Sequence, residues 1–190
     1  MRIIGGKLRN KKLYFPKNLK TRPLKDSVRE NIFNILRHSN DVDIDIKNSE
    51  VLDLYAGTGS FGLECVSRES SRVVFIENDL DALTDLKKNI KNLNCQNKTV
   101  LLAQDVLEFF NPLNLELYKK KFNIIFLDPP YQDKKYIEVI EILKREDLLN
   151  QKHIIVIHRE IKSEDGIDKY INIVEKRVYG RSEIFFGKLF

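Results

Sequence analysis

Short apolar runs alternate with longer amphipathic segments through most of the chain, and this alternation constrains the fold more than any other feature of the sequence. The apolar runs predict strands near 50–54, 72–77, 99–103, 122–127 and 153–158, and the segments between them predict helices near 60–68, 80–93, 105–110 and 134–144. Such an alternation is typical of right-handed βαβ units, in which helices cover both faces of a parallel sheet.

The two ends of the chain depart from this alternation. Residues 171–179 and 182–189 are joined at Gly180-Arg181 and predict an antiparallel hairpin. Near the other end, Ser27 and Glu30 have the spacing of a capping box, which predicts a helix there. With 190 residues, 42% of them hydrophobic, the chain suits one α/β core with a mostly parallel seven-stranded sheet and a carboxy-terminal antiparallel hairpin.

A glycine-rich turn follows the first predicted strand. Gly57, Gly59 and Gly62 have the spacing G-x-G-x-x-G, which lets a backbone approach a bound nucleotide or nucleoside closely. Glu77 lies 20 residues after Gly57, at the end of the second strand, where an acid can bind ribose hydroxyls. The spacing alone also fits a dinucleotide fold. Asp53, at the end of the first strand, favours a ligand that carries an ammonium group over a pyrophosphate.

A second motif, Asp128-Pro129-Pro130-Tyr131, follows the apolar run 122–127. The two prolines lack a backbone N–H and stop the strand, so the Asp128 carboxylate and nearby carbonyls can face outward as acceptors. Such a site suits the exocyclic amine of a nucleobase, with Tyr131 as a stacking surface. The alternative is an ordinary strand-ending turn with a surface tyrosine.

A fourth acid, Asp105, follows the apolar run 100–103. It is placed to receive the amino group of an adenine, or to cap the short helix that begins at Val106. Each acid alone is compatible with a solvated loop. Together, the four acids at four strand ends predict one site along the carboxyl edge of the sheet.

The order of these motifs resembles that of class I S-adenosylmethionine-dependent amino-methyltransferases, which have a Rossmann-like fold. More narrowly, the segments 1–6, 21–23, 28–30 and 33–34 together with Asp26 resemble the bacterial small-subunit (16S) ribosomal RNA guanine-N2 methyltransferases, nearly end to end. Leu24-Lys25 stand where that family often has a threonine pair, and the carboxy-terminal third has no motif that we place.

The resemblance implies transfer of a methyl group from S-adenosylmethionine to the N2 amine of a guanine in small-subunit ribosomal RNA, as free RNA or in an assembly particle. It implies catalytic roles for Asp128, Pro129, Pro130 and Tyr131. It further implies that the cofactor is bound by Asp53, Tyr55, Ala56, Gly57, Thr58, Gly59, Glu77, Asn78, Asp105 and Val106.

Basic residues are concentrated at the amino terminus. Residues 1–25 carry nine of them and no acid, against a whole-chain net charge of +5, so residues 26–190 sum to −4. We divide the chain into an RNA-binding arm, 1–25, and a methyltransferase domain, 26–190; a solubilising tail is the alternative for the arm. The predicted RNA contacts are Arg2, Lys7, Arg9, Lys11, Lys12, Arg22, Arg29, Lys134 and Lys135.

Several classes of protein are disfavoured by the sequence. No apolar stretch has membrane length and the start lacks a signal-peptide core, so we expect a cytoplasmic protein, and we expect a monomer. Cys65 and Cys95 with His38, His153 and His158 show no metal-ligand spacing, so we expect no metal and reduced thiols.

Other functions stay open at this point. One is an amino-methyltransferase that acts on DNA adenine or cytosine, or on another RNA or a protein amide, although the chain leaves no room for a dedicated DNA-recognition domain. A nucleotide-dependent oxidoreductase would explain the glycine spacing, and a noncatalytic RNA-binding module would explain the arm.

Overall fold

The computed structural model describes residues 1–15, 24–117, 121–161 and 166–189. Its centre is a seven-stranded sheet in the order β3-β2-β1-β4-β5-β7-β6. The first five strands along the chain are parallel, whereas β7 runs antiparallel to both β5 and β6. The strands are β1 Glu50–Leu54, β2 Arg72–Glu77, β3 Thr99–Ala103, β4 Phe122–Leu127, β5 Leu149–Glu160, β6 Asn172–Tyr179 and β7 Ser182–Lys188. The predicted fold class and the carboxy-terminal hairpin are confirmed.

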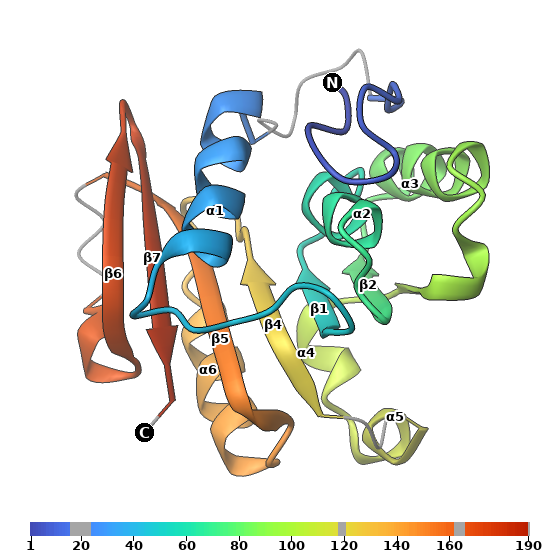
Figure 1. The fold of residues 1–190 in the computed structure, drawn as a ribbon. Coiled ribbons are helices and arrows are strands. Elements are labelled where there is room, and N and C mark those ends of the chain that lie inside the picture. Colours follow the sequence, from blue (N-terminus) through green and yellow to red (C-terminus); the bar gives the residue numbers. More distant parts are fainter. Residues whose placement is uncertain (16–23, 118–120, 162–165, 190) are drawn as a thin grey trace.

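Helices cover both faces of the sheet (Figure 1). The apolar faces of α1, α2 and α3 contribute to one core cluster, and those of α4 and α6 contribute to the cluster on the other face. The helices are α1 Asp26–His38, α2 Ser60–Ser67, α3 Leu80–Asn92, α4 Val106–Phe109, α5 Pro112–Leu117 and α6 Tyr136–Arg145, with short 3-10 turns at Gln96–Lys98 and Ile167–Lys169. α5 was not predicted, and the predicted capping box does not form: α1 begins after Lys25, which makes no side-chain cap.

Stacked aromatic rings join α1 and α2 to the sheet. The Phe61 ring lies 4.1 Å from the Phe126 ring of β4 and 5.0 Å from the Phe33 ring of α1, centroid to centroid. All three rings are buried. This stack holds α1 over the middle of the sheet, with its first turn at the edge where the parallel strands end (Figure 1).

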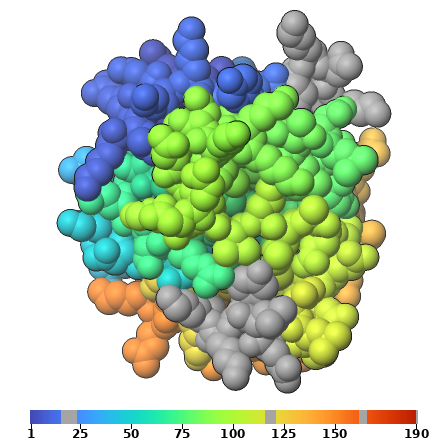
Figure 2. Space-filling model, turned by 90° about the vertical axis from the view of Figure 1, so that its right-hand side faces the viewer, coloured from blue at the N-terminus to red at the C-terminus, as the bar shows by residue number. Residues whose placement is uncertain are grey.

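Residues 1–15, which belong to the predicted RNA-binding arm, pack against α2 and α3. Ile3 and Leu13 belong to the same core cluster as α1 and α2. Glu64 of α2 accepts hydrogen bonds from the backbone N–H groups of Ile4 and Gly5, at 2.8 and 2.7 Å, and Asn89 of α3 accepts one from the N–H of Tyr14. Figure 2 shows this blue amino-terminal segment lying directly against the green of α3. The contacts bring Met1 and Phe15 to the edge of the sheet at which the candidate site lies.

Candidate active site

A cleft of about 470 Å³ lies at the carboxyl ends of β1, β2, β4 and β5. In the sheet, β2 and β3 lie on one side of β1, and β4 lies on its other side. The strand order therefore reverses between β1 and β4, and ligands of open α/β sheets bind at such a switch point. The walls of the cleft combine the glycine loop, the end of β2, the motif after β4 and residues of the amino-terminal part of the chain. The lining residues are Met1, Phe15, Leu24, Tyr55, Ala56, Gly57, Thr58, Ser60, Glu77, Asn78, Asp79, Asp128, Pro129, Pro130, Tyr131 and His158. The structure thus brings together most of the predicted cofactor and catalytic residues.

The glycine loop needs backbone conformations that few residues adopt. Tyr55, Gly57 and Gly59 all have positive φ, of 58°, 56° and 79°. A side chain at Gly59 would collide with Leu86, because its Cβ would lie 2.3 Å from a Leu86 methyl carbon. A Cβ at Gly57 would meet no heavy atom within 4 Å, so this glycine leaves open space beside the loop. The loop backbone therefore forms a cradle that a ligand can approach closely.

Glu77 holds the glycine loop in place. One carboxylate oxygen accepts a hydrogen bond from the Gly57 N–H at 2.6 Å, and the other accepts from the N–H groups of Asn78 and Asp79, both at 2.8 Å. Asp79 in turn caps α3 by accepting from the Ala82 N–H. The carboxylate of Glu77 therefore couples the end of β2 to the loop after β1, and it lines the cleft.

Asp53 lies behind the loop, and its position corrects the predicted contact with a ligand's ammonium group. The residue is 1% exposed and does not line the cleft. One carboxyl oxygen accepts from the Gly62 N–H at 2.9 Å, and the other is buried without a partner among the described residues. Burial raises the pKa of Asp53 well above its usual value, and the negative charges of Asp128 and Glu77 raise it further, against the Gly62 hydrogen bond. Asp53 orients the first turn of α2.

Asp105 acts as a helix cap, one of the two roles open to it from the sequence. Its side chain accepts from the Leu107 N–H at 2.9 Å and so begins α4. The other oxygen lies 3.4 Å from the side-chain nitrogen of Asn78, which does line the cleft. Neither Asp105 nor the buried Val106 is part of the cleft wall, so a contact from them to an adenine stays a prediction.

The Asp128 side chain is oriented by His158, at the end of the neighbouring strand β5. Nδ1 of His158 lies 2.7 Å from Oδ1 of Asp128. An ionised carboxylate can only accept, so the proton lies on Nδ1 of the imidazole. Nε2 is buried and has no partner among the described residues. Oδ2 of Asp128 also has no hydrogen-bond partner among the described residues, so this oxygen is available as an acceptor for a ligand.

Arg159 holds the rest of the motif from the next position in β5. Its guanidinium donates to the carbonyl oxygens of Pro130 and Tyr131, at 3.1 and 2.8 Å, and lies over the ring of Tyr136. The side chain is almost fully buried. Neither Arg159 nor His158 was given a role from the sequence. Both follow the apolar run 154–157, so their place at a strand end is the same signal that marked the four acids.

The predicted RNA-binding residues fall into three groups. Arg2, Lys7, Arg9, Lys11, Lys12, Lys134 and Lys135 are exposed, as phosphate contacts require. Arg22 lies outside the described residues. Arg29 is fully buried, donates to the carbonyl of Arg2 and pairs with Asp26 at 3.0 Å, so the prediction of an RNA contact is wrong for this residue. Arg29 instead fixes the start of the chain to α1.

Within residues 1–15, 24–117, 121–161 and 166–189, no group of three or more histidine, cysteine or acidic side chains is arranged to hold a metal ion. Over the same ranges, none of the helices combines the length and the apolarity that crossing a bilayer requires.

The sheet order, the glycine loop after β1 and the acidic motif after β4 define a class I methyltransferase. The chain belongs to the family described as Conserved hypothetical protein 95, whose sequence profile matches residues 1–188. The resemblance noted from the sequence is thereby confirmed at the level of the family.

Relatives and solved structures agree with this assignment. The chain is 33% identical over 162 residues to ribosomal RNA small subunit methyltransferase D of Haemophilus influenzae, which covers 84% of this chain and 79% of the relative. It is 32% identical over 164 residues to the Escherichia coli protein of the same name, over 86% and 76% of the two chains. The solved structure of the Escherichia coli protein yhhF superposes with a TM-score of 0.81 at 25% identity, covering 100% of this chain and 97% of that one.

Proposed function

We propose that this protein transfers a methyl group from S-adenosylmethionine to the exocyclic N2 amine of a guanine in small-subunit ribosomal RNA. The observation that carries the proposal is the free Oδ2 of Asp128, which His158 orients in the cleft that the glycine loop also lines. The relatives named as small-subunit ribosomal RNA methyltransferases support the RNA substrate. A ribosomal RNA substrate, free or in an assembly particle, fits a cytoplasmic protein. We further propose that the protein acts as a monomer.

The residues on one side of the cleft fit the proposed cofactor. The open space at Gly57 admits a close ligand, and residues 55–58 line the cleft there. Glu77 is placed at the end of β2, where an acid suits ribose hydroxyls, and Asn78 lies beside it. These residues would hold S-adenosylmethionine, which supplies a methyl group already activated by its positive sulfur.

The residues on the other side of the cleft suit an amine that is a poor nucleophile. The lone pair of the guanine amine is delocalised into the ring, so the enzyme must favour a pyramidal nitrogen. Oδ2 of Asp128 and the Pro129 carbonyl each accept one N–H of the amine, which turns the lone pair out of the base plane, and Tyr131 stacks on the base. Asp128 then accepts the proton that the nitrogen loses. Holding both reactants in one cleft provides much of the acceleration.

His158 holds Asp128, and Arg159 holds Pro130 and Tyr131, in fixed positions before substrate arrives. Preorganised polar groups stabilise charge that develops in the transition state without having to reorient. The two guanidinium hydrogen bonds fix Pro130 and Tyr131, and the imidazole fixes Asp128. The motif after β4 is therefore held from the neighbouring strand.

The test is methylation of unmodified small-subunit ribosomal RNA, as a free transcript and as an assembled particle, followed by mass spectrometry of the nucleosides. We expect N2-methylguanosine. Methylated adenosine or cytidine would support the amino-methyltransferase alternative instead. Calorimetric titration with S-adenosylhomocysteine and with NAD, in the absence of RNA, separates a methyltransferase from an oxidoreductase.

A further inference from the structure

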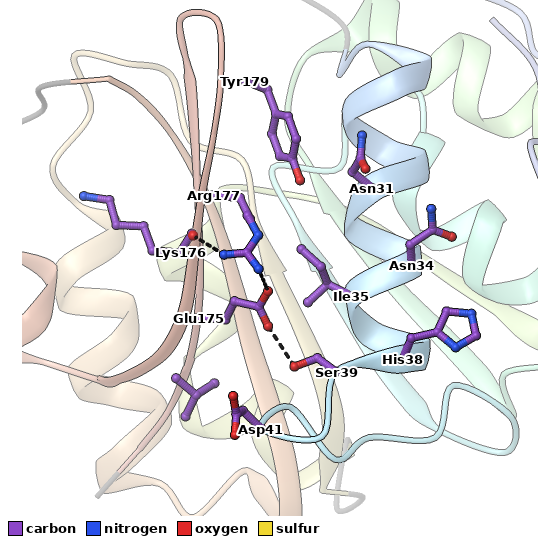
Figure 3. Close-up of a pocket in the computed structure, with 11 residues that line it drawn as sticks. Asn31, Asn34, Ile35, His38, Ser39, Asp41, Glu175, Lys176, Arg177 and Tyr179 are labelled. Carbon is purple, nitrogen blue, oxygen red and sulfur yellow. Dashed lines mark hydrogen bonds and ion pairs between the residues drawn. The ribbon is translucent and has the colours of Figure 1, made fainter.

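A second hollow of about 680 Å³ lies between α1 and the edge strand β6 (Figure 3). Its size falls in the range of roughly 300–1,000 Å³ that is typical of ligand pockets. Most of the side chains that line it are polar: Asn31, Asn34 and His38 from α1, and Glu175, Arg177 and Tyr179 from β6. We call this hollow the α1–β6 groove.

One end of the groove opens at the catalytic edge of the sheet. Tyr179 is the last residue of β6 and pairs with Ser182, which in turn pairs with Glu160 on β5, two residues beyond His158. On the opposite wall, Leu24 lines the catalytic cleft just before α1 begins. Asn31 is seven residues further on, roughly 10 Å along a helix axis. A flexible polymer whose one unit occupies the cleft can therefore extend into the groove.

The charges inside the groove are balanced, whereas several of its neutral polar groups are free to bind. Glu175 accepts from the Ser39 hydroxyl at 2.7 Å and pairs with Arg177 at 2.6 Å. The side chains of Asn34 and His38 and the hydroxyl of Tyr179 have no partner among the described residues. Burial raises the pKa of Tyr179, so its hydroxyl remains a donor. In Figure 3, Tyr179 of β6 and Asn31 of α1 face the space between the strand and the helix.

We propose that the α1–β6 groove binds the nucleotides that flank the methylated base in the substrate RNA. The proposal rests on the proposed function and adds the site that selects sequence context. Tyr179 stacks on an unpaired base, Asn34 and His38 bind base edges or a 2′-hydroxyl, and Arg177 faces the phosphates. Proteins read RNA in this way mainly where its bases are splayed out of a helix. The guanine whose amine is to be methylated must also be splayed out.

A protein partner fits the groove less well. The buried centre of a protein interface is usually apolar and depleted in charge. Here Ile35 and Val174 are the only apolar residues among those that line the groove in the described part of the chain, and Glu175, Lys176, Arg177 and Asp41 lie among them. Amide, imidazole, phenol and guanidinium groups are instead the side chains that bind single-stranded RNA.

Photocrosslinking tests the location directly. p-Benzoylphenylalanine replaces His38 in the full chain, the protein is irradiated with unmodified small-subunit ribosomal RNA, and the adducts are mapped against the nucleotide that the wild type methylates. We expect adducts within a few nucleotides of that position. Adducts at remote sites only, or with protein only in a cell extract, would overturn the proposal, and the second result would point to a protein partner.

Substitutions of groove residues test how much each side chain contributes to RNA binding. Tyr179→Ala should raise KM for the RNA about tenfold, as loss of one stacking platform does, whereas Tyr179→Phe should retain most of the affinity. Asn34→Ala should raise KM less, and the affinity for S-adenosylhomocysteine should stay unchanged in all three. Glu30→Ala on α1 and Val178→Ala on β6 are matched controls, because both residues are exposed and lie outside the groove.

The methylation activity of the wild type distinguishes a failure of this proposal from a failure of the proposed function. If wild type methylates the RNA but Tyr179→Ala has an unchanged KM, the groove does not bind substrate while the proposed function stands. If wild type does not methylate the RNA, the proposed function fails first. A melting curve of each variant shows whether a raised KM reflects loss of folded protein.

Discussion

The catalytic cleft and the anchored amino-terminal segment both depend on a buried carboxyl group beside α2, but the two groups have different surroundings. Asp53 has one oxygen bonded to the Gly62 N–H and one without a partner among the described residues. Glu64 has both oxygens bonded, to the N–H groups of Ile4 and Gly5, and it also pairs with Arg68 at 3.0 Å. A buried polar group without a partner costs free energy, whereas a fully bonded one stabilises the fold.

The difference separates a binding site from a structural joint. At the cleft, burial raises the pKa of Asp53, the charges of Asp128 and Glu77 raise it further, and one of its oxygens has no partner among the described residues. At the joint, every acceptor of Glu64 is used to fix residues 1–15, whose outer surface carries the basic side chains. The joint should therefore determine stability, and the cleft should determine turnover.

Replacing Glu64 should give the largest loss of stability. Glu64→Ala removes the partner of Arg68 and leaves two backbone N–H groups without an acceptor, so we expect the free energy of unfolding to fall by about 3–5 kcal/mol. Urea denaturation measures this. Glu69→Ala, which removes only an exposed pair with Lys7, is the control and should change little. Equal effects of the two variants would mean that Glu64 does not anchor the segment.

Replacing Asp128 should affect turnover instead. Asp128→Ala should lower kcat by about a hundredfold or more, as expected for the loss of a preorganised polar group. The melting temperature and the affinity for S-adenosylhomocysteine should stay close to those of wild type, because Asp128 is partly exposed and lies on the substrate side. Asp168→Ala, an exposed acid outside the cleft, is the control. Near-normal methylation by folded Asp128→Ala would remove the residue from the mechanism.

The sequence predicted the cleft better than the joint for a physical reason. The acids of the cleft come at the ends of apolar strands, and parallel strands bring their carboxyl ends to one edge, so local patterns suffice. Glu64 and Asn89 lie within helices, and their partners are 59 to 75 residues away in sequence. No local pattern reports such a pairing. For the same reason Arg29 was expected at the surface, although it is buried against Arg2.

Some elements were also missed because their signals are weak. α5 is a six-residue helix that begins at Pro112, too short for its periodicity to be read. β5 extends to residues 149–160, beyond the predicted 153–158, because residues 150–152 are polar and the register of its pairing with β4 shifts between Phe122 and Ile124. The strands β1, β2, β3 and β4, which are largely apolar, were predicted to the residue.

The raised pKa of Asp53 makes the stability of the protein depend on pH. Because burial raises its pKa, the folded protein keeps the proton to a higher pH than the unfolded chain, whose value is about 4. Between those two values the folded state binds more protons, so this residue makes the free energy of unfolding fall as pH rises, by up to about 1.4 kcal/mol per pH unit. Asp53→Asn keeps an acceptor for Gly62 and should flatten the decline. Urea denaturation at a series of pH values measures the free energy of unfolding of both proteins. If it changed with pH equally in wild type and variant above pH 4, the prediction would be wrong.

The smallest expected effect concerns the basic surface of the anchored segment. Arg2, Lys7, Arg9, Lys11 and Lys12 are exposed, while the backbone that carries them is fixed to α2 and α3. If these side chains neutralise phosphates, log affinity for RNA should fall by roughly 0.7–0.9 per contact against log salt, and replacing all five by neutral residues should flatten that slope. A fluorescence-anisotropy salt series on both proteins measures it.

Because residues 1–15 are anchored to α2 and α3, the five substitutions can be checked for effects on the fold as well as on RNA binding. Neutral side chains at five exposed positions leave Glu64, Asn89 and the buried Ile3 and Leu13 untouched, so the melting temperature should not fall. Cofactor affinity should stay unchanged too, because the cleft is lined by residues 55–58 and Glu77 and by none of the five substituted residues. A solubilising surface predicts identical salt slopes for the two proteins, and that result would leave the cleft and the α1–β6 groove as the RNA-binding parts of the molecule.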